Sequence, residues 1–489
     1  MLGDMLSTGM LPRFIAFTDH VRHGVHTDPH TIPGLVTLFT ILLAGAVVVG
    51  VVTKRLKLPY TVALVLAGLV VAYFHRAPEA AKLSPDLIFY IVLPPILFRA
   101  GLLIDVKQLG KNWLSIAAVT LAGTLVTTVI VAVAIRPFLT PEIVTSNSVW
   151  LAALLMGAMV SPTDPVSVMS IIKSIGLPER LRIVIQGESL FNDGIAVVLF
   201  LMLLVLLFGA NTSISGGADS PQTSPGTVAV GVDDSQTNWS LFDQDDRPAA
   251  TDSMVDRIGS TVWHVIKYSA LGLLIGLIMG WIALWMMRWV QDPVLENAIT
   301  IVLAYGSFMF ASIEQVSGVA AVIMAGILVG VTRWHDKNAQ ISVRTISVFW
   351  ESVDYILNSL IFLMVGIELQ FIGIDSLFSR NVLLAIGAVF VAMLISRALV
   401  VYPTGVFYGK NWPRGGTHVV FWSGLRGCVT LALVLVLPDT FAGGADPLKS
   451  FLLPVVFGCV LLTLLLQATT MRPLIHLLGC VGSTEDKRA

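Results

Sequence analysis

The chain has 489 residues, of which 55% are hydrophobic and only 12% are charged. With a mean hydropathy of +0.84, it has too little polar surface to cover a soluble globule of this length. The composition therefore predicts an integral membrane protein and argues against a soluble enzyme or a nucleic-acid partner. The net charge of −1 adds nothing, because the distribution of charge among loops orients a membrane protein.

The apolar runs approach about 20 residues, the length that an α-helix needs to cross a bilayer, and they lack the alternation of an outer-membrane barrel. We therefore predict an all-α polytopic membrane protein with about thirteen transmembrane helices. In chain order, these spans are expected near residues 33–53, 59–75, 84–104, 113–135, 148–172, 182–209, 260–288, 294–312, 317–332, 346–369, 380–403, 416–437 and 450–478.

Alternate loops are richer in Lys and Arg, as at 54–57 and 333–344. By the positive-inside rule these loops are cytoplasmic. The rule places the N-terminus outside and the C-terminus in the cytoplasm, which requires an odd number of spans. The expected location is the plasma membrane, which in a bacterium is the cytoplasmic or inner membrane.

A long polar segment at 211–257, rich in Gly, Ser, Thr and Asp, divides the apolar pattern near its middle. It has little to bury, so we expect a loosely ordered outer loop. The four histidines at 20–30 are expected to lie in a solvated tail, because no Cys or paired carboxylate completes a metal site. No removable signal peptide is expected. The predicted units are a tail at 1–32, a first repeat at 33–209, the outer loop at 210–259, a linking span at 260–291, a second repeat at 292–478 and a cytoplasmic tail at 479–489.

Carboxylates interrupt two of the predicted spans. Asp164 lies in MGAMVSPTDPVSVMSII, and Glu188 and Asp193 lie in ESLFNDGIAVVLFLMLLVLLF. A carboxylate in hydrocarbon costs several kcal/mol unless it is paired, hydrated or neutralised, so such residues are functional candidates. The prolines around 161–164 are expected to break the fifth span, and the carbonyls freed there must line an enclosed cavity, where they suit a hard cation.

The twelfth span, VVFWSGLRGCVTLALVLVL, is interrupted by Gly424, Arg426 and Gly427. Spans five and twelve occupy the same place in the two predicted repeats, and an offset of seven spans makes those repeats antiparallel. Inverted repeats with broken helices in corresponding positions indicate a secondary transporter with its site near the bilayer midplane.

Helical spacing sorts the polar residues of the sixth span. Glu188 and Asp193 are roughly 140° apart around a helix, whereas Ser189 and Asp193, at i and i+4, share a face. Ser189 and Asp193 are therefore expected to offer oxygens to one ion. Glu188 needs another partner, for which the buried cation Arg426 is the candidate.

Six short motifs occur in order along the chain: LPPILF at 93–98, SPTDPV at 161–166, GESLFNDG at 187–194, SGVAAVIMAGILVG at 317–330, LIFLMVGIEL at 360–369 and GLRG at 424–427. Together they resemble the motifs of the sodium/proton exchanger family, and more narrowly those of its NhaP-type branch. The resemblance implies a thirteen-span inverted-repeat fold, usually a homodimer, that exchanges Na+ or Li+ for H+. Gln186, where many members carry an acid, and the long outer loop depart from the family pattern.

The same resemblance implies roles for individual residues. The implied Na+ ligands are Asp164, Ser189 and Asp193, assisted by the Thr163 backbone and Glu188. It also implies that Arg426 pairs with Glu188. The pair Asn192–Asp193 is typical of electroneutral members.

Burial and a neighbouring like charge favour the protonated form of a carboxylate, so Asp193 is expected to exchange a proton near cytoplasmic pH. Competition of Na+ and H+ for Asp193, with alternating access, would give exchange of one Na+ for one proton. K+/H+ exchange by the same fold and a cation channel are alternatives. An intramembrane aspartyl protease using Asp164 and Asp193 is a third, but its Gly-x-Gly-Asp signature is absent. No cofactor is expected, and the expected partners are the ions, membrane lipid and a second subunit.

Other polar residues receive simpler interpretations. Four acids near span ends are expected to be hydrated: Glu314, Glu351, Asp354 and Glu368. Arg397 is interpreted as the structural partner of a buried carbonyl or acid. Trp281, Trp285 and Trp289 recur every fourth residue and are expected to face lipid or a second subunit.

Overall fold

The computed structural model describes a large part of the chain. The described residues are 32–56, 59–74, 78, 81–104, 106–144, 148–164, 178–208, 254–290, 292–334, 340–405, 415–437, 440–441, 444–445 and 447–479. The predicted histidine-containing tail, the outer loop from 211 to 253 and the cytoplasmic tail from 480 lie outside them. The last residues assigned to the loop are helical instead, because the next helix begins at Met254.

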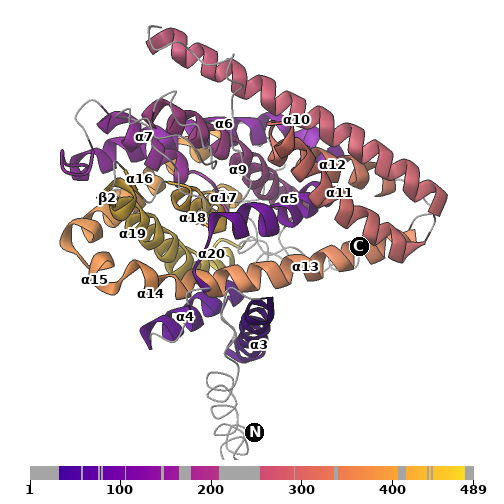
Figure 1. Ribbon diagram of the computed structural model, residues 1–489, viewed down its shortest axis with the longest axis horizontal. Helices are drawn as coiled ribbons and strands as arrows, with labels where there is room; N and C mark the ends of the chain where they lie inside the picture. Colours follow the sequence, from indigo (N-terminus) through magenta and orange to yellow (C-terminus); the bar gives the residue numbers. More distant parts are fainter. Residues whose placement is uncertain are drawn as a thin grey trace, which may run out of the picture.

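The described chain is a bundle of helices (Figure 1). In order they are α3 (Ile32–Leu56), α4 (Tyr60–Tyr73), the π-helical η2 (Leu87–Val92), α5 (Leu93–Leu102), α6 (Val106–Ile135), the short η3 (Arg136–Phe138), α7 (Val149–Met159), α9 (Glu179–Phe208), α10 (Met254–Val290), α11 (Pro293–Ile313), α12 (Gly318–Trp334), α13 (Gln340–Ile367), α14 (Leu369–Ile372), α15 (Ile374–Leu377), α16 (Arg380–Thr404), α17 (Gly416–Trp422), α18 (Cys428–Leu435), α19 (Pro447–Leu462), the π-helical η7 (Thr463–Ala468) and α20 (Thr469–Leu477). Two strands of two residues each, β1 (Thr440–Phe441) and β2 (Gly444–Ala445), pair antiparallel between α18 and α19.

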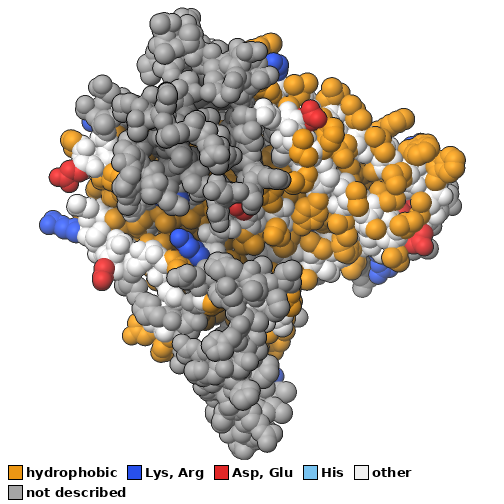
Figure 2. Space-filling view, in the orientation of Figure 1, with side chains coloured by type: hydrophobic (Ala, Val, Ile, Leu, Met, Phe, Trp, Pro, Cys, Tyr) orange, Lys and Arg blue, Asp and Glu red, His pale blue; other side chains and the backbone are white. Residues whose placement is uncertain are grey.

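The length and composition of the helices fit a bilayer. Among the described residues, 8 helical segments are long and apolar enough to cross a membrane, and shorter apolar helices accompany them. The eight are Val36–Thr53, Ile116–Phe138, Arg180–Leu204, Ile266–Val290, Pro293–Ile313, Val343–Ile372, Arg380–Thr404 and Pro447–Leu477. Apolar side chains cover much of the surface where α10, α11 and α12 lie (Figure 2). Such a surface suits lipid, so the prediction of a helical polytopic membrane protein is confirmed.

Small residues bring some helices into direct backbone contact. A Cβ placed on Gly68 in α4 would lie 2.2 Å from the Leu363 carbonyl oxygen of α13. Gly366 of α13 meets Val65 of α4 in the same way. Close approach through glycine compensates for the absence of a hydrophobic driving force between helices in lipid.

Both predicted helix breaks are present in the described chain. Helix α7 ends at Met159, and residues 161–164 are not helical. Helices α17 and α18 are separated by a non-helical segment at 424–427. The Asp164 backbone N–H donates to the Leu425 carbonyl at 2.8 Å, so the two breaks contact each other. Residues 165–172, the rest of the predicted fifth span, lie outside the described residues.

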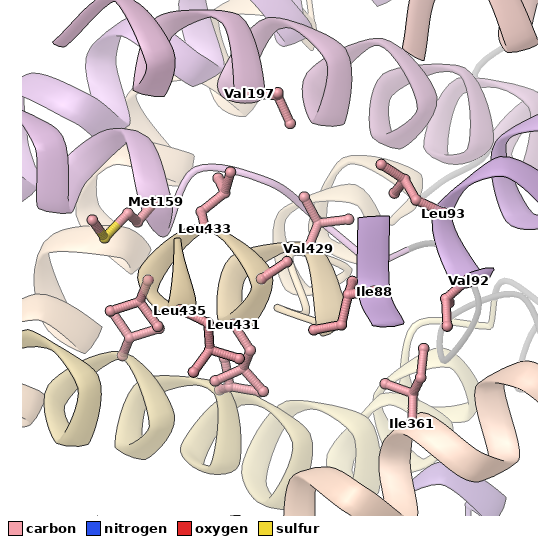
Figure 3. Packing of buried hydrophobic residues seen from close by; sticks show 14 of the residues in the cluster. Ile88, Val92, Leu93, Met159, Val197, Ile361, Val429, Leu431, Leu433 and Leu435 are labelled. Carbon is pink, nitrogen blue, oxygen red and sulfur yellow. The ribbon is translucent and has the colours of Figure 1, made fainter. Parts of the chain in front are cut away.

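The short helix α18 is enclosed by apolar side chains from several elements. Leu431 and Leu433 are buried, and Figure 3 shows α18 surrounded by side chains that include Met159 of α7, Val197 of α9 and Ile361 of α13. This packing fixes the segment at 424–427 against the end of α7.

Candidate ion site

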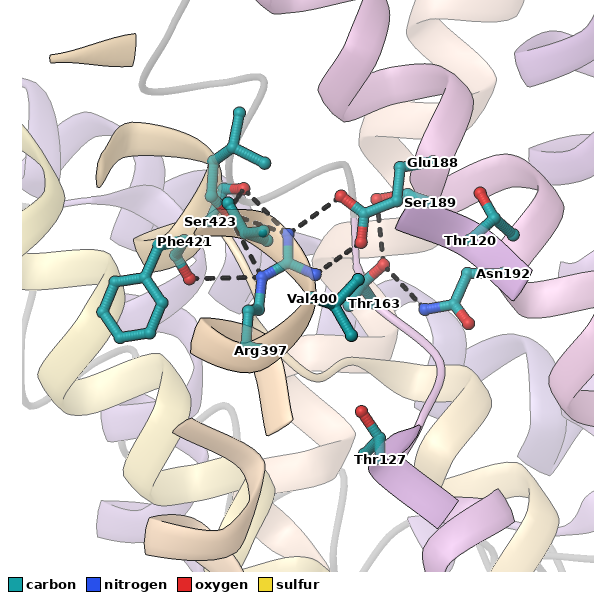
Figure 4. Close-up of polar contacts among 12 residues, drawn as sticks. Thr120, Thr127, Thr163, Glu188, Ser189, Asn192, Arg397, Val400, Phe421 and Ser423 are labelled. Atoms are coloured by element: carbon teal, nitrogen blue, oxygen red, sulfur yellow. Dashed lines mark hydrogen bonds and ion pairs between the residues drawn. The ribbon is translucent and has the colours of Figure 1, made fainter. Parts of the chain in front are cut away.

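Helix α9 carries most of the candidate site on two of its faces. Ser189 and Asp193 face residues 161–164. Glu188 faces α16 and α17, and Figure 4 shows Ser189 and Glu188 directed to these two sides. This division follows from the helical repeat, as the spacing predicts.

Thr163 is the meeting point of the first face. Its Oγ1 donates to Ser189 Oγ at 3.1 Å, and its backbone N–H lies near the Asp193 carboxylate. Thr163 and Ser189 are both buried. The N–H can approach the carboxylate because residues 161–164 are not helical.

Asp193 contributes an oxygen that the protein leaves unsatisfied. Its Oδ1 is buried and has no hydrogen-bond partner within the described parts of the chain. The Asp164 carboxylate, also buried, lies close enough to act on the charge of Asp193. Two carboxylates and adjacent hydroxyls are oxygen donors of the kind that a hard cation or a proton takes.

Asp164 is held close to the second helix break. A Cβ placed on Gly427 would lie 2.6 Å from Asp164 Cβ and 3.3 Å from its Oδ2. Glycine is therefore required at 427 for Asp164 to occupy this position. The contact joins the ends of α7 and α18 at the candidate site.

Asn192 holds the non-helical segment after α7 in place through hydrogen bonds. Its Nδ2 donates to the Ser161 carbonyl at 2.8 Å and to Thr163 Oγ1 at 3.3 Å. Its Oδ1 accepts a hydrogen bond of 2.6 Å from Thr124 Oγ1 on α6. Every amide atom is thus engaged with protein.

The second face of α9 corrects one expectation. Glu188 forms its ion pair with Arg397 of α16, not with Arg426. Glu188 Oε2 accepts from Arg397 Nη2 at 2.9 Å, and Oε1 accepts from Nη1. Arg397 also donates to the carbonyls of Val420 and Phe421 at the end of α17 (Figure 4). The interpretation of Arg397 as the partner of a buried acid and carbonyls is confirmed.

Arg426 binds backbone carbonyls and not the Glu188 carboxylate. Its Nη1 donates to the carbonyls of Ser161 and Pro162, at 2.5 Å and 2.9 Å. The helix break frees these carbonyls, and the guanidinium satisfies them. The sequence predicts that carbonyls freed here line an enclosed cavity and suit a hard cation. In the structure, the cationic group that the Ser161 and Pro162 carbonyls bind is the Arg426 guanidinium. The positive charge of Arg426 balances the partial negative charge of these carbonyl oxygens at the end of α7.

A small cavity of about 10 Å³, comparable to the volume that one water molecule needs, lies on the guanidinium side. Its lining includes Ser161, Glu188, Asn192, Arg397 and Arg426. Asp164 and Asp193 do not line it. The cavity adjoins the ion pair and is separate from the unsatisfied oxygen of Asp193.

Two of the acids expected to be hydrated are buried instead. Asp354 is in an ion pair of 2.7 Å with Arg99 of α5. Glu368 accepts from the Leu83 backbone N–H at 2.9 Å. Glu368 directly follows the end of α13, whereas Asp354 lies in the middle of that helix, so the expectation that both acids lie near helix ends is wrong for Asp354. Glu314 and Glu351 are exposed as expected.

The three tryptophans of α10 are also exposed: Trp281, Trp285 and Trp289.

Sequence reasoning missed one residue of the site, Thr124. The signal was available, because Thr120, Thr124 and Thr128 recur every fourth residue in an otherwise apolar span and define one polar stripe on α6.

A buried cluster of carboxylates and hydroxyls inside a bundle of membrane-crossing helices defines the class of ion-moving membrane proteins. A family profile described as "Sodium/hydrogen exchanger, transmembrane" matches residues 38–477. The chain therefore belongs to the sodium/hydrogen exchanger family, as its motifs predict, and is a secondary transporter, not an enzyme.

Relatives and a solved structure agree with this assignment. The Na(+)/H(+) antiporter NhaG of Bacillus atrophaeus is 31% identical over 469 residues, which cover 93% of this chain and 76% of that protein. The Na(+)/H(+) antiporter ApNhaP of Aphanothece halophytica is 29% identical over 441 residues, covering 88% and 72%. The sodium proton antiporter MjNhaP1 from Methanocaldococcus jannaschii has a similar fold, with a TM-score of 0.64 at 18% identity, covering 92% of this chain and 99% of that chain.

Proposed function

We propose that the protein exchanges Na+ or Li+ for H+ across the membrane, one cation for one proton. The observation that carries the proposal is the buried, unsatisfied Oδ1 of Asp193, which lies on the same face of α9 as Ser189 and close to Asp164. Relatives named Na(+)/H(+) antiporters support the choice of ions.

In this proposal, Na+ is held as substrate by oxygens of Asp164, Ser189 and Asp193, with Thr163 beside them. Glu188 supports the site from the other face of α9, because Arg397 already neutralises it. Asn192 and Arg426 brace the backbone at 161–163. The ligand set contains the hard oxygen donors that Na+ requires.

Exchange follows from competition for Asp193. An ionised carboxylate attracts Na+, and a protonated one has lost the charge that attracts it. If the site opens to each side in turn, Na+ leaves when a proton takes its place. Asn192 adds no ionisable group, so each crossing carries a single positive charge in either direction and the cycle is electroneutral.

The proposed architecture has thirteen spans in two inverted repeats, at 33–209 and 292–478, joined by the span at 260–291. The contact between Asp164 and Leu425 supports it, because inverted repeats bring corresponding broken helices together at the midplane. We place the N-terminus outside, the C-terminus in the cytoplasm and the protein, as a homodimer, in the plasma membrane.

A transmembrane pH-gradient assay in inside-out vesicles tests this function. NaCl, LiCl and KCl are added in turn to vesicles with the wild type or Asp193→Asn. We expect Na+ or Li+ to collapse the gradient with the wild type and not with the variant at equal protein content. Collapse by K+ alone would assign the alternative K+/H+ exchange. A cation current without proton movement would indicate a channel.

A further inference from the structure

We propose that Thr124 of α6 is a positioning residue for the cation site, acting through Asn192 on Thr163 and Ser189. The inference rests on the proposed function, because it concerns the same site. Thr124 lies outside the sequence motifs of that site, on a different helix. Its role follows from the direction of three successive hydrogen bonds, which run from Thr124 through Asn192 and Thr163 to Ser189.

The first step is the orientation of the Asn192 amide. The Ser161 carbonyl can only accept, so the amide atom at 2.8 Å from it must be Nδ2. Figure 4 shows the amide nitrogen directed at Thr163 and the oxygen directed away. The opposite amide atom is therefore Oδ1, and it needs a donor.

Thr124 supplies that donor. Its Oγ1 lies 2.6 Å from Asn192 Oδ1 and 2.8 Å from the carbonyl of Thr120. A hydroxyl has one hydrogen, so only one of these acceptors receives it at a time. Asn192 Oδ1 has the shorter contact, which assigns the hydrogen of Thr124 to the amide.

The donor-to-acceptor direction of these hydrogen bonds continues from Asn192 to the proposed ion ligands. Asn192 Nδ2 donates to Thr163 Oγ1, so Thr163 directs its own hydrogen to Ser189 Oγ at 3.1 Å. Ser189 Oγ uses one lone pair to accept this bond and keeps a second lone pair for a cation. The hydroxyl of Thr124 thereby fixes the orientation of a proposed Na+ ligand on another helix.

All four residues of this hydrogen-bonded chain are buried, so the loss of one donor is costly. Thr124 is 0% exposed, and Asn192, Thr163 and Ser189 are 4%, 2% and 3% exposed. Thr124 does not line the small cavity beside Asn192, and an unsatisfied buried acceptor is costly. Without the Thr124 hydroxyl, Asn192 Oδ1 has no donor, and the amide loses one of the hydrogen bonds that hold Nδ2 toward Ser161 and Thr163.

The test compares Thr124→Val, which keeps the shape and removes the donor, with Thr124→Ser, which keeps the donor. Thr128→Val is the matched control, because Thr128 lies one turn further on α6 and its Oγ1 donates within that helix, to the Thr124 carbonyl at 2.8 Å. Thr124→Ala is a second donor-free variant should Thr124→Val not fold. The purified proteins are compared in proteoliposomes for the KM for Na+ and the maximal rate of exchange.

We expect Thr124→Val to raise the KM for Na+ about tenfold, with a smaller change in maximal rate, because the loss of one buried hydrogen bond is of this size. Thr124→Ser and Thr128→Val should stay within about twofold of the wild type. In an Asn192→Ala background, Thr124→Val should add nothing, because its effect passes through the amide.

An unchanged KM in Thr124→Val would overturn the inference, as would an equal rise in Thr128→Val. The same holds if Thr124→Val raises the KM as much in the Asn192→Ala background as in the wild type. These results concern Thr124 alone. A wild type that exchanges no Na+ for protons would instead refute the proposed function.

Discussion

At the scale of single residues, the buried carboxylate of Glu188 is neutralised by Arg397 of α16, while Arg426 binds backbone carbonyls. Helical spacing separates Glu188 from Ser189 and Asp193, and the structure agrees. Spacing does not choose between Arg397 and Arg426, because both interrupt apolar spans and both are buried cations in need of acceptors. The choice depends on how α16 packs beside α9, a tertiary contact that local pattern does not encode. Arg397 reaches the carboxylate, and Arg426 binds carbonyls freed by the helix break.

A double-mutant cycle on the ion pair measures this assignment. Removing one partner of a buried pair costs about 3–5 kcal/mol, because the other charge is left uncompensated. We expect Glu188→Leu and Arg397→Met each to lower the thermal unfolding midpoint strongly, and the double variant to lower it by less than the sum. The matched cycle of Glu188→Leu with Arg426→Met should be closer to additive. A larger coupling to Arg426 than to Arg397 would contradict the structure.

At the scale of elements, the helix breaks were predictable and their contact was not. Pro162 and Pro165 mark the end of α7, and Gly424 and Gly427 mark the gap between α17 and α18. These residues act through backbone geometry, which is local and therefore legible in sequence. The bond from Asp164 N–H to the Leu425 carbonyl joins segments far apart in the chain. The repeats predicted from the sequence indicated that the breaks are related, without specifying which atoms meet.

The close approach of the breaks predicts the effect of Gly427→Ala. The added Cβ would lie 2.6 Å from Asp164 Cβ, and overpacking of this kind costs about 1–3 kcal/mol. We expect the displaced carboxylate to weaken Na+ binding, so that the KM for Na+ rises about tenfold. Gly387→Ala in α16 is the control, because a Cβ there meets nothing within 4 Å. Equal KM values for the two variants in vesicles would show that the contact at 427 is unimportant.

At the scale of the whole molecule, hydropathy was sufficient for the class of fold. Long apolar runs predict membrane-spanning helices because the bilayer allows few alternatives. Whether an individual acid is buried or hydrated was harder to predict. Glu368 directly follows the end of α13, where hydration is a reasonable expectation, yet it accepts a hydrogen bond from the Leu83 backbone N–H. Asp354 lies in the middle of α13, where it pairs with Arg99 of α5. Both outcomes depend on which segments pack against α13, so they require the tertiary structure.

Electroneutral exchange is a property of the whole transport cycle. One Na+ moving against one proton transfers no net charge, so a membrane potential should not change the rate or the final Na+ gradient. We expect the same exchange rate and the same final Na+ gradient in proteoliposomes with and without a potential imposed by K+ and valinomycin. If each cycle moved one net charge, the driving force would change by roughly 2.3 kcal/mol per 100 mV. A shift of the final gradient with potential would refute exchange of one Na+ for one proton.

The central claim is that Na+ and H+ compete for Asp193. The most direct measurement is calorimetric titration of the purified protein with Na+ across a series of pH values, with Asp193→Asn as the control. Where the site is mostly protonated, competition for one carboxylate predicts that the apparent Kd for Na+ rises about tenfold for each unit by which the pH falls, at constant stoichiometry. Asp193→Asn should bind little Na+ at any pH. A Kd that does not change with pH, or undiminished binding by the variant, would contradict the account.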